Sequence, residues 1–426
     1  MTSIRTYTEP QKTIKLYGDY DVVVAGGGVA GFAAAVASAR NKAKTLIIER
    51  FPFFGGTATA SLMASINAFR NQKKPDYLQT SKGIAEEVIL RLKKIGGLGR
   101  SCYEHIKEYP NTKGKLSYSF AIDTEKFKFV TLQMAKEAGL HILFHTWFSD
   151  VIMKKNRAAG VIFENKSGRQ AAYGKVIIDA TGDGDVAFKA GVPCRQTRHD
   201  EKPRLSDNLM YKIGGYTEDH PLFGSEAGGW TVVWGPNVGC PNGADADELT
   251  EAEIKARLEV YKDFQARQKK MPFLKNAQVI ETPPLIGIRQ TRFIKGLYTL
   301  NGDDVLKGRR FDDVIALGSA PVIHYFGYRR YLEHEGYDIP YRCLIPKKIN
   351  GLIVTGRCMS SDQVAYESWR AMAPVMSISE AAGTAAALSA KAGVDPKDLD
   401  IKTLQHQLIK QGAEIGQGRG KKSGRA

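Results

Sequence analysis

Segment 21–31 constrains the fold of this chain most strongly, because it reads as a buried strand that enters a helix through three consecutive glycines. A second apolar strand follows and ends in the acid Glu49. This order of strand, glycine turn, helix, strand and acid is the fingerprint of a dinucleotide-binding unit. In it, Gly26 allows the tight turn, Gly28 lets the backbone approach a pyrophosphate, and Gly31 lets the helix pack closely on the strand.

Two structural alternatives compete with this interpretation. Glycine-rich turns are common, so the same glycines could serve packing alone. The run 22–39 is also long and apolar enough to resemble a signal segment or a membrane span. The glycines and the charged stop at Arg40 and Lys42 argue against a span. Glu49 favours nucleotide binding, because a carboxylate at that offset holds a ribose hydroxyl and disfavours the 2′-phosphate of NADP.

Composition places the chain among ordinary globular proteins, with 426 residues, 43% hydrophobic and 25% charged. That length predicts two or three domains. The formal net charge of +16 is spread along the chain, and no recognition-helix, zinc-finger or RNA-binding pattern accompanies it. The one concentrated basic stretch, 416–425, is rich in glycine and is expected to be disordered. We therefore expect a cytoplasmic protein without membrane insertion and without a nucleic-acid partner.

The five cysteines lie far apart in the sequence, at Cys102, Cys194, Cys240, Cys343 and Cys358. No two of them have the spacing of a metal site or of a redox pair. We therefore expect buried reduced thiols, no bound metal and no disulfide reductase chemistry.

Hydrophobic periodicity divides the chain into a nucleotide fold and an inserted cap, the latter marked by aromatics, loops and turns. Helices are predicted at 84–94, 123–138, 251–270 and 376–392, the last starting just after Pro374. The predicted parts are a polar leader at 1–18, a discontinuous nucleotide-binding domain at 19–60, 120–194 and 286–395, a cap at 61–119 and 195–285, and a C-terminal helix with a flexible basic tail at 396–426.

Four separated segments fit a single flavin cofactor. Besides the fingerprint, 54–59 supplies glycines and small residues that suit packing beside a planar ring, and 177–185 is a strand that enters a glycine turn. The fourth segment, 354–357, precedes the helix expected from Met376, whose N-terminus would stabilise negative charge on a reduced flavin. Plain core packing of that alanine-rich helix is the alternative.

The chain resembles the FAD-dependent oxidoreductases of the glutathione-reductase-like superfamily, and more narrowly the bacterial family with a discontinuous flavin domain and a single FAD. The matching motifs are 26–31 with Glu49, 55–57, 179–185, 287–292, 339–346, 351–357 and 379–386. They span the chain from about residue 19 to 395. The resemblance implies an α/β fold of the Rossmann-like, FAD-binding type, discontinuous in sequence, with an inserted α+β mixed-sheet domain that covers the substrate.

The resemblance also implies which residues lie near FAD. It places 180–182 near the adenosine and pyrophosphate, 356–357 near the pyrophosphate or ribityl chain, and 375–377 under the pyrimidine edge of the flavin. The full set expected to bind FAD is Gly26, Gly28, Val29, Ala30, Gly31, Glu49, Arg50, Gly55, Gly56, Thr57, Ala58, Val151, Ala180, Thr181, Gly182, Gly356, Arg357, Val375, Met376 and Ser377.

Arg292 is the first candidate for contact with substrate. It lies three residues after Arg289, and on a strand positions three apart point to opposite faces, so only one of the two would face the flavin. The resemblance suggests that Arg292 lies at the active-site end, where it would hold an oxyanion. The structural alternative is an ion pair with an acid, for which the candidates are Asp303, Asp304 and Asp313.

His324 is the candidate base, because the unperturbed pKa of histidine is close to neutral. A structural histidine between domains is the alternative. Family members often carry a histidine near 360–366, but this chain has none there, which puts a base from that loop in doubt. Weaker candidates for contact with substrate are Tyr341, Arg342, Glu367 and Arg370.

The expected reaction is hydride transfer from a C–H bond of a small, anionic substrate to flavin N5, giving a ketone, imine or alkene. His324 would take the accompanying proton, and the reverse reaction would use the same parts. No second strand with G-x-G-x-x-G follows, so electrons would pass to an unknown acceptor rather than to a nicotinamide domain of the chain. An oligomer is possible.

Two other functions stay open from the sequence. A flavoprotein that modifies tRNA is slightly favoured by the net charge, but the chain lacks a reactive cysteine motif and a long helical RNA-binding extension. A non-catalytic nucleotide-fold binding protein that has lost its flavin is the second.

Overall fold

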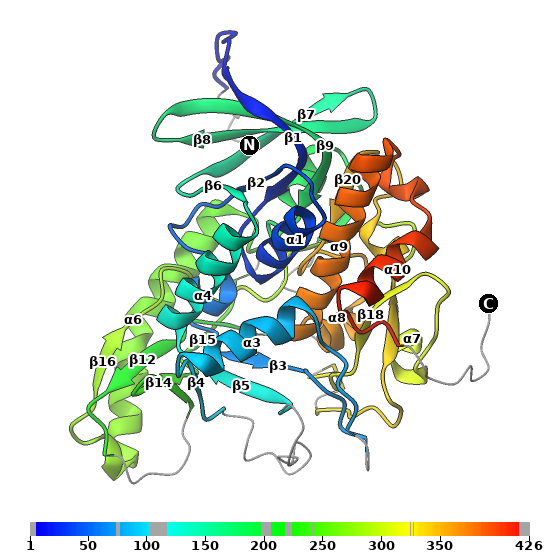
Figure 1. Ribbon diagram of the computed structural model, residues 1–426. Coiled ribbons are helices and arrows are strands. Elements are labelled where there is room, and N and C mark those ends of the chain that lie inside the picture. Colours follow the sequence, from blue (N-terminus) through cyan, green and yellow to red (C-terminus); the bar gives the residue numbers. More distant parts are fainter. Residues whose placement is uncertain are drawn as a thin grey trace.

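A computed structural model of the chain describes residues 6–73, 77–101, 117–196, 206–217, 224–240, 242–323, 325–326 and 328–416. Its centre is a seven-stranded sheet in the order β6-β2-β1-β9-β8-β7, with β20 paired to β9 beside β8 (Figure 1). The strands are β1 (Lys15–Ala25), β2 (Thr45–Ile48), β6 (His141–Leu143), β7 (Trp147–Lys154), β8 (Arg157–Asn165), β9 (Gly168–Asp179) and β20 (Leu352–Val354).

The central sheet is parallel where it meets the predicted nucleotide site. β1 pairs in parallel with both β2 and β9, and the second half of β9 pairs in parallel with β20. The first half of β9 instead continues into the antiparallel pair β8 and β7. The carboxyl ends of β1, β9 and β20 therefore lie together, which is the edge where open α/β sheets bind ligands.

Two helices cover the sheet at this edge, α1 (Val29–Arg40) and α9 (Met372–Ala392), and they lie side by side (Figure 1). They approach closely, since a Cβ on Gly383 would lie 1.9 Å from the carbonyl oxygen of Ala34. The helices α3 (Ile84–Lys94), α4 (Thr124–Glu137) and α10 (Ile401–Lys410) extend the same hydrophobic core. The opposite face of the sheet packs a second core with α5 (Asp185–Lys189).

The cap combines two small antiparallel sheets and one long helix. Its sheets are β3-β5-β4 and β13-β14-β12-β16, and a backbone bridge between Arg100 and Glu226 joins them edge to edge. The helix α6 packs on the second sheet around Tyr211 and Phe264. The cap elements are β3 (Ser65–Asn67), β4 (Leu98–Gly99), β5 (Ser119–Ile122), β12 (Tyr211–Gly214), β13 (Ser225–Ala227), β14 (Trp230–Val233), β16 (Gln278–Glu281) and α6 (Ala246–Lys270).

Short elements connect the cap to the nucleotide fold. Three two-stranded pairs form, β10 with β17, β11 with β15 and β18 with β19. Their bounds, with those of the short helices, are β10 (Cys194–Gln196), β11 (Asp207–Asn208), β15 (Asn237–Val238), β17 (Arg292–Ile294), β18 (Val314–Gly318), β19 (Tyr337–Pro340), α2 (Thr57–Ala60), α7 (Gly302–Lys307) and α8 (Gln363–Trp369).

The α/β fold with a Rossmann-like sheet and a mixed cap confirms the predicted fold class, although several boundaries differ. β1 starts at Lys15, inside the predicted leader, because 15–18 already pair with β9. α6 starts at Ala246 rather than 251, because the side chain of Asp245 caps it. α9 starts at Met372 rather than 376, with Pro374 inside its first turn. Across the described part of the chain, no helix is long and apolar enough to cross a membrane.

Candidate functional site: a nucleotide groove

The turn after β1 has the geometry that the fingerprint predicts. Gly26 has φ +98°, a conformation that side chains rarely adopt. A Cβ on Gly31 would lie 1.7 Å from the carbonyl oxygen of Gly26, so only glycine lets α1 come this close to the strand. α1 begins at Val29 with no side-chain cap, and its first backbone N–H groups are therefore available to an anion.

Gly28 shows that this turn fits a pyrophosphate. Its backbone is ordinary, with φ −61° and ψ −179°, and a Cβ added to it would meet only the Cα of Gly56, at 3.8 Å. Neither strain nor crowding by the protein requires glycine here. The absent side chain leaves a cradle beside the N-terminus of α1, and a cofactor phosphate suits that space.

Glu49 lies at the end of β2, buried beside the turn. Its Oε2 accepts a hydrogen bond from the backbone N–H of Gly27, and its Oε1 accepts one from the N–H of Phe51 at 2.9 Å. Burial raises the pKa of this carboxyl, while the two backbone N–H groups act in the opposite direction. Each carboxylate oxygen can accept a second hydrogen bond, so Glu49 retains acceptors for a ribose hydroxyl.

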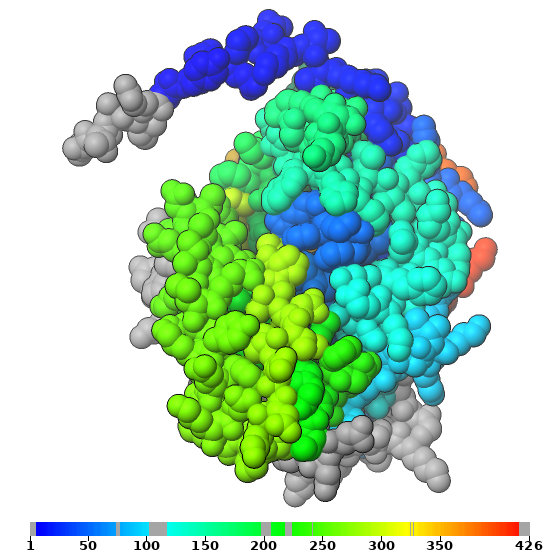
Figure 2. All heavy atoms as spheres, turned by 90° about the vertical axis from the view of Figure 1, so that its left-hand side faces the viewer, coloured from blue at the N-terminus to red at the C-terminus, as the bar shows by residue number. Residues whose placement is uncertain are grey.

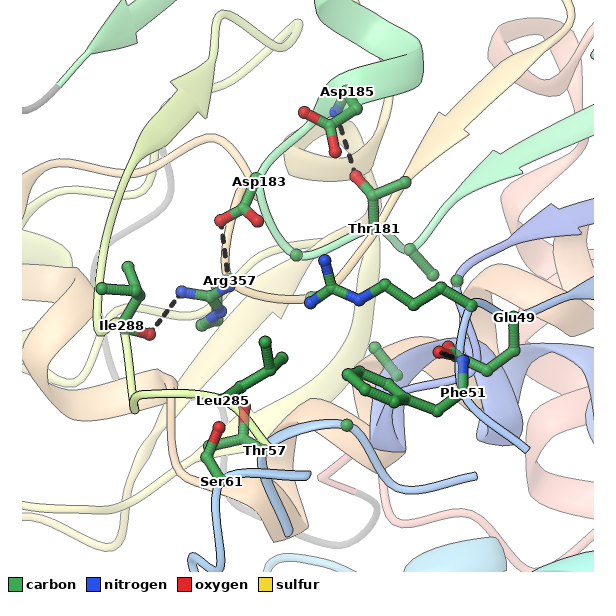
Figure 3. A pocket seen from close by; sticks show the side chains of 18 of the residues that line it. Glu49, Phe51, Thr57, Ser61, Thr181, Asp183, Asp185, Leu285, Ile288 and Arg357 are labelled. Atoms are coloured by element: carbon green, nitrogen blue, oxygen red, sulfur yellow. Dashed lines mark hydrogen bonds and ion pairs between the residues drawn. The ribbon is translucent and has the colours of Figure 1, made fainter. Parts of the chain in front are cut away.

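A groove runs from Glu49 along the turn to the first turn of α9. Figure 3 shows Glu49 and Phe51 at one side of it, Thr57 and Ser61 below, and Arg357 across from them. The predicted cofactor residues that line the groove are Gly26, Gly28, Val29, Ala30, Glu49, Arg50, Gly56, Thr57, Ala180, Thr181, Gly182, Gly356, Arg357 and Val375. Four sequence segments predicted to share one cofactor thus meet in one groove.

The other predicted cofactor residues lie behind the groove wall. Gly31 packs on Gly26, Gly55 packs on Thr59 and Phe127, and Val151 pairs with Val161 between β7 and β8. Ala58, Met376 and Ser377 are buried in helices α2 and α9. Because α9 begins a turn earlier than predicted, Val375 takes the position at the groove and the next two residues fall inside the core.

One side of the groove is aromatic and cationic. The guanidinium of Arg50 lies over the rings of Phe51 and Trp147, 5.1 Å from each centroid. Trp147 is 58% exposed although it lines the groove, so its indole stays accessible to a planar ligand. Figure 2 views the molecule from the side of α6, and there the blue N-terminal part of the chain is visible at the surface between the green region of α6 and the turquoise segments.

The turn after β9 is held by a buried acid, Asp179. Its side chain accepts hydrogen bonds from the N–H and hydroxyl of Thr181 and from the N–H of Ala187 at 2.8 Å. Burial raises the pKa of Asp179 to about 6, against these hydrogen bonds. This network fixes the turn whose next residues line the groove.

Arg292 lies at the start of β17 and contacts that turn. Its Nη1 donates to Asp185 Oδ1 at 2.8 Å and to the carbonyl oxygen of Asp183 at 3.1 Å, and its guanidinium lies over the ring of Phe188. Arg292 therefore does form an ion pair, but with Asp185 and not with the acids that the sequence indicated. Those acids pair elsewhere, Asp303 with Lys307, Asp304 with Arg309 and Asp313 with Arg342.

Arg289 and His324 are two further residues that the sequence predicted to contact substrate. Arg289 precedes β17 and donates from Nε to the carbonyl oxygen of Ser206 at 2.7 Å, so it points to the cap rather than to the turn after β9. His324 lies outside the described residues. Its neighbour Tyr325 donates its backbone N–H to Glu367 of α8 at 2.7 Å.

Sequence reasoning missed part of the groove. Asp183 and Asp185 belong to a motif that it had singled out, and Ile288 belongs to another, so those motifs carried the signal. The cap residues and Trp147 had no comparable signal. The lining residues that were missed are Ile48, Phe51, Ser61, Thr146, Trp147, Phe148, Asp183, Asp185, Gly243, Leu249, Glu253, Leu285, Ile286 and Ile288.

Comparison with characterised proteins gives partial relatives. A digeranylgeranylglycerophospholipid reductase 2 of Methanothermobacter thermautotrophicus is 29% identical over 201 residues, which is 47% of this chain and 48% of that protein. A thiamine thiazole synthase of Methanococcus vannielii is 30% identical over 172 residues, 38% of this chain and 56% of that protein. The chain therefore spans about half the length of the curated relatives it matches.

Among solved structures, a geranylgeranyl bacteriochlorophyll reductase-like protein of Thermoplasma acidophilum matches with a TM-score of 0.49 and 17% identity, over 93% of this chain and 84% of that one. The sequence model of the FAD dependent oxidoreductase family matches residues 21–230 and 222–408. These two ranges cover most of the chain and include all four segments of the groove. The protein therefore belongs to the FAD-dependent oxidoreductases, a family of enzymes, and FAD is its cofactor.

Proposed function

We propose that the protein moves a hydride between a small, anionic organic substrate and FAD, as a dehydrogenase or oxidase with a single FAD and a separate electron acceptor. The observation that carries this proposal is the groove that joins the fingerprint turn to the first turn of α9 at Val375. The isoalloxazine of bound FAD supplies the hydride acceptor or donor. Because Val375 lines the groove, the positive end of the α9 dipole would lie beside bound FAD and favour negative charge there.

Arg292 is proposed to hold the substrate oxyanion. It is 9% exposed, and its Nε is buried without a hydrogen-bond partner among the described residues. A guanidinium binds a carboxylate through two parallel N–H donors, so spare donors on a buried arginine suit an anion. Its acid partner, Asp185, lines the groove, and Arg292 lies behind that carboxylate without lining the groove itself.

His324 is proposed to exchange the proton that accompanies the hydride. In the oxidative direction bound FAD would accept the hydride of the substrate C–H bond, and the imidazole would accept the proton of the substrate O–H or N–H. The bond between Tyr325 and Glu367 ties the residue after His324 to α8, the helix just before α9, although neither of the two bonded residues lines the groove. Burial raises the pKa of the Glu367 carboxyl.

Anaerobic mixing of the holoenzyme with hydroxy acids, amino acids and matched neutral amides or esters tests the proposal. We expect at least one anionic compound to bleach the visible flavin absorbance. Arg292→Met should then raise the KM for that compound at least about 10-fold while the neutral analogue changes little, since one charge-assisted contact contributes about 1.5–3 kcal/mol. Bleaching by neutral compounds alone, or an equal loss for both, would contradict an anionic substrate.

The reductive direction is the second candidate, and the similarity to a protein named as a reductase favours it. The apolar residues Leu285, Ile286 and Ile288 along the groove would also suit an unsaturated substrate. The same anaerobic absorbance assay tests the reductive direction, because enzyme reduced by dithionite should regain its flavin absorbance when an alkene is added. No recovery with any alkene would leave the oxidative direction.

A further inference from the structure

The roof of the groove is the segment 283–291, here called the strap. It has irregular backbone between β16 and β17, and its residues Leu285, Ile286 and Ile288 line the groove. The opposite wall is the glycine turn after β1. FAD bound against that turn would face the strap across the groove.

On the cap side, several hydrogen bonds hold the strap. Glu253 of α6 accepts from the N–H of Ile286 at 2.6 Å, and Arg257 donates to the carbonyl oxygen of Pro283 at 2.9 Å. The N–H of Gly287 donates to the carbonyl oxygen of Asn208 at 2.9 Å. These hydrogen bonds tie the strap to the cap.

On the nucleotide-binding side, Arg357 holds the middle of the strap, and further hydrogen bonds join Leu285 to Ala60, Gln290 to Gln363, and the carbonyl oxygen of Arg289 to the hydroxyl of Tyr366. Arg357 Nη1 donates to the carbonyl oxygen of Ile288 at 2.6 Å, and its Nη2 donates to Asp183 Oδ1 at 2.9 Å (Figure 3). The same oxygen of Asp183 accepts from the hydroxyl of Thr291, at the strap's other end, at 2.8 Å. The side chains of Arg357 and Asp183 are only 24% and 23% exposed, so solvent screens their ion pair less than a surface pair.

We propose that Arg357, Asp183 and Thr291 form a latch that keeps the strap closed over FAD, so that the cofactor enters and leaves only when the latch opens. Arg357 is then a positioning residue whose two terminal nitrogens are used to tie the cap to the turn after β9. This inference rests on FAD binding alone and is independent of the hydride chemistry proposed above.

The rates of FAD uptake and release distinguish a latch from a direct phosphate ligand. A latch raises the barrier in both directions, so weakening it should speed both uptake by the apoprotein and release from the holoenzyme. Loss of a direct ligand speeds release without speeding uptake. Both rates follow from the fluorescence of free FAD.

Arg357→Gln should raise both rates about 10-fold or more, as expected for loss of a charged hydrogen bond. Thr291→Val should raise both about 2- to 10-fold, and Thr291 does not line the groove. The matched control is Arg310→Gln, because Arg310 likewise bridges a backbone carbonyl oxygen, that of Gly336, and an aspartate, Asp338, away from the groove. Both rates should stay unchanged in this control.

Two results would overturn the latch. One is faster release with unchanged or slower uptake in Arg357→Gln, which assigns the guanidinium to the cofactor itself. The other is a Thr291→Val protein whose uptake and release match the wild type. Because Thr291→Val removes a single hydroxyl, it keeps the test decisive if Arg357→Gln does not fold.

Discussion

The floor of the FAD groove is built from regular elements, whereas its roof, the strap, has irregular backbone held by side chains. In the floor, β1, α1 and the turn between them meet through backbone atoms. The residues from Val22 to Ala25 are fully buried, and Asp21 before them is half-buried. In the roof, many of the contacts are hydrogen bonds with side chains: Glu253 accepts one, and Arg257 and Arg357 donate others. Close packing of backbone atoms leaves no room for an added side chain or for movement, whereas a few side-chain hydrogen bonds can break and re-form.

This difference assigns separate tasks to the two walls. The floor must keep its shape in the absence of cofactor, because its geometry is fixed by strand pairing and by glycines that admit no Cβ. The roof is the wall held largely by side-chain hydrogen bonds, so it is the wall expected to move when FAD is exchanged. Substitutions in the two walls should therefore affect different quantities, the free energy of unfolding for the floor and the exchange of FAD for the roof.

Gly31→Ala should have the largest effect on folding. Its new Cβ would lie 1.7 Å from the carbonyl oxygen of Gly26, so the helix and the strand must separate. We expect a loss of about 3 kcal/mol or more in the free energy of unfolding, measured by urea denaturation. Gly18→Ala on β1 is the control, because its Cβ would meet only the side chain of Tyr20, at 3.4 Å. Equal urea midpoints for the two variants would show that the floor is not rigid.

Glu380 links α9 to α3, and its titration should have the next largest effect. It lies on α9, where its side chain accepts from the N–H of Ile84, the first residue of α3, and from Gln411, each at 2.9 Å. Burial raises its pKa to about 7 from an ordinary 4.5, with Arg40 opposing the shift and Glu87 adding to it. This carboxyl therefore prefers to be protonated in the folded protein.

The sign of the pH effect follows from that preference. Between pH 4.5 and about 7 the folded protein retains a proton that the unfolded chain releases, so the free energy of unfolding falls as pH rises through this window. The fall due to Glu380 is at most about 3 kcal/mol. Glu380→Gln should flatten the plot of urea midpoint against pH, and the exposed Glu251→Gln should leave it unchanged. A plot for Glu380→Gln that follows the wild type would remove Glu380 as the cause.

The sequence predicted the floor and the helices of the same core well, because their signals are local. The apolar positions of 84–94 fall on one helix face, and the predicted bounds of α3 match the structure. The fingerprint likewise uses neighbouring residues, so Gly26 and Glu49 were found with their positions at the groove. The start of α9 was placed one turn late because Pro374 resembles the first residue of a helix, although proline is tolerated throughout the first turn.

The roof could not be predicted in the same way, because its bonds join distant positions. Arg357 is 69 residues from Ile288 and 174 from Asp183 along the chain. The strap has no apolar periodicity, and nothing in its composition indicates which carbonyl oxygen an arginine will meet. The sequence predicted that Arg357 lies near the cofactor. Its partners within the protein, Ile288 and Asp183, follow only from the three-dimensional structure.

Gly28→Ala should have the smallest effect on folding and separates the two tasks within the floor itself. Gly28 has a backbone conformation that alanine readily adopts, and its Cβ would meet only the Cα of Gly56, at 3.8 Å. The free energy of unfolding of the apoprotein should therefore change by less than about 1 kcal/mol, and it can rise because alanine restricts the unfolded chain.

The same Cβ would occupy the cradle beside the N-terminus of α1, so FAD should bind at least about 10-fold more weakly, measured by titration of the apoprotein. Gly18→Ala again serves as the control and should leave FAD affinity unchanged. If Gly28→Ala bound FAD as tightly as the wild type, the pyrophosphate would have to lie away from this turn. A stable apoprotein with weakened FAD binding, set against the unfolding of Gly31→Ala, would show that two glycines three residues apart serve different needs, Gly31 the packing of the floor and Gly28 the cofactor.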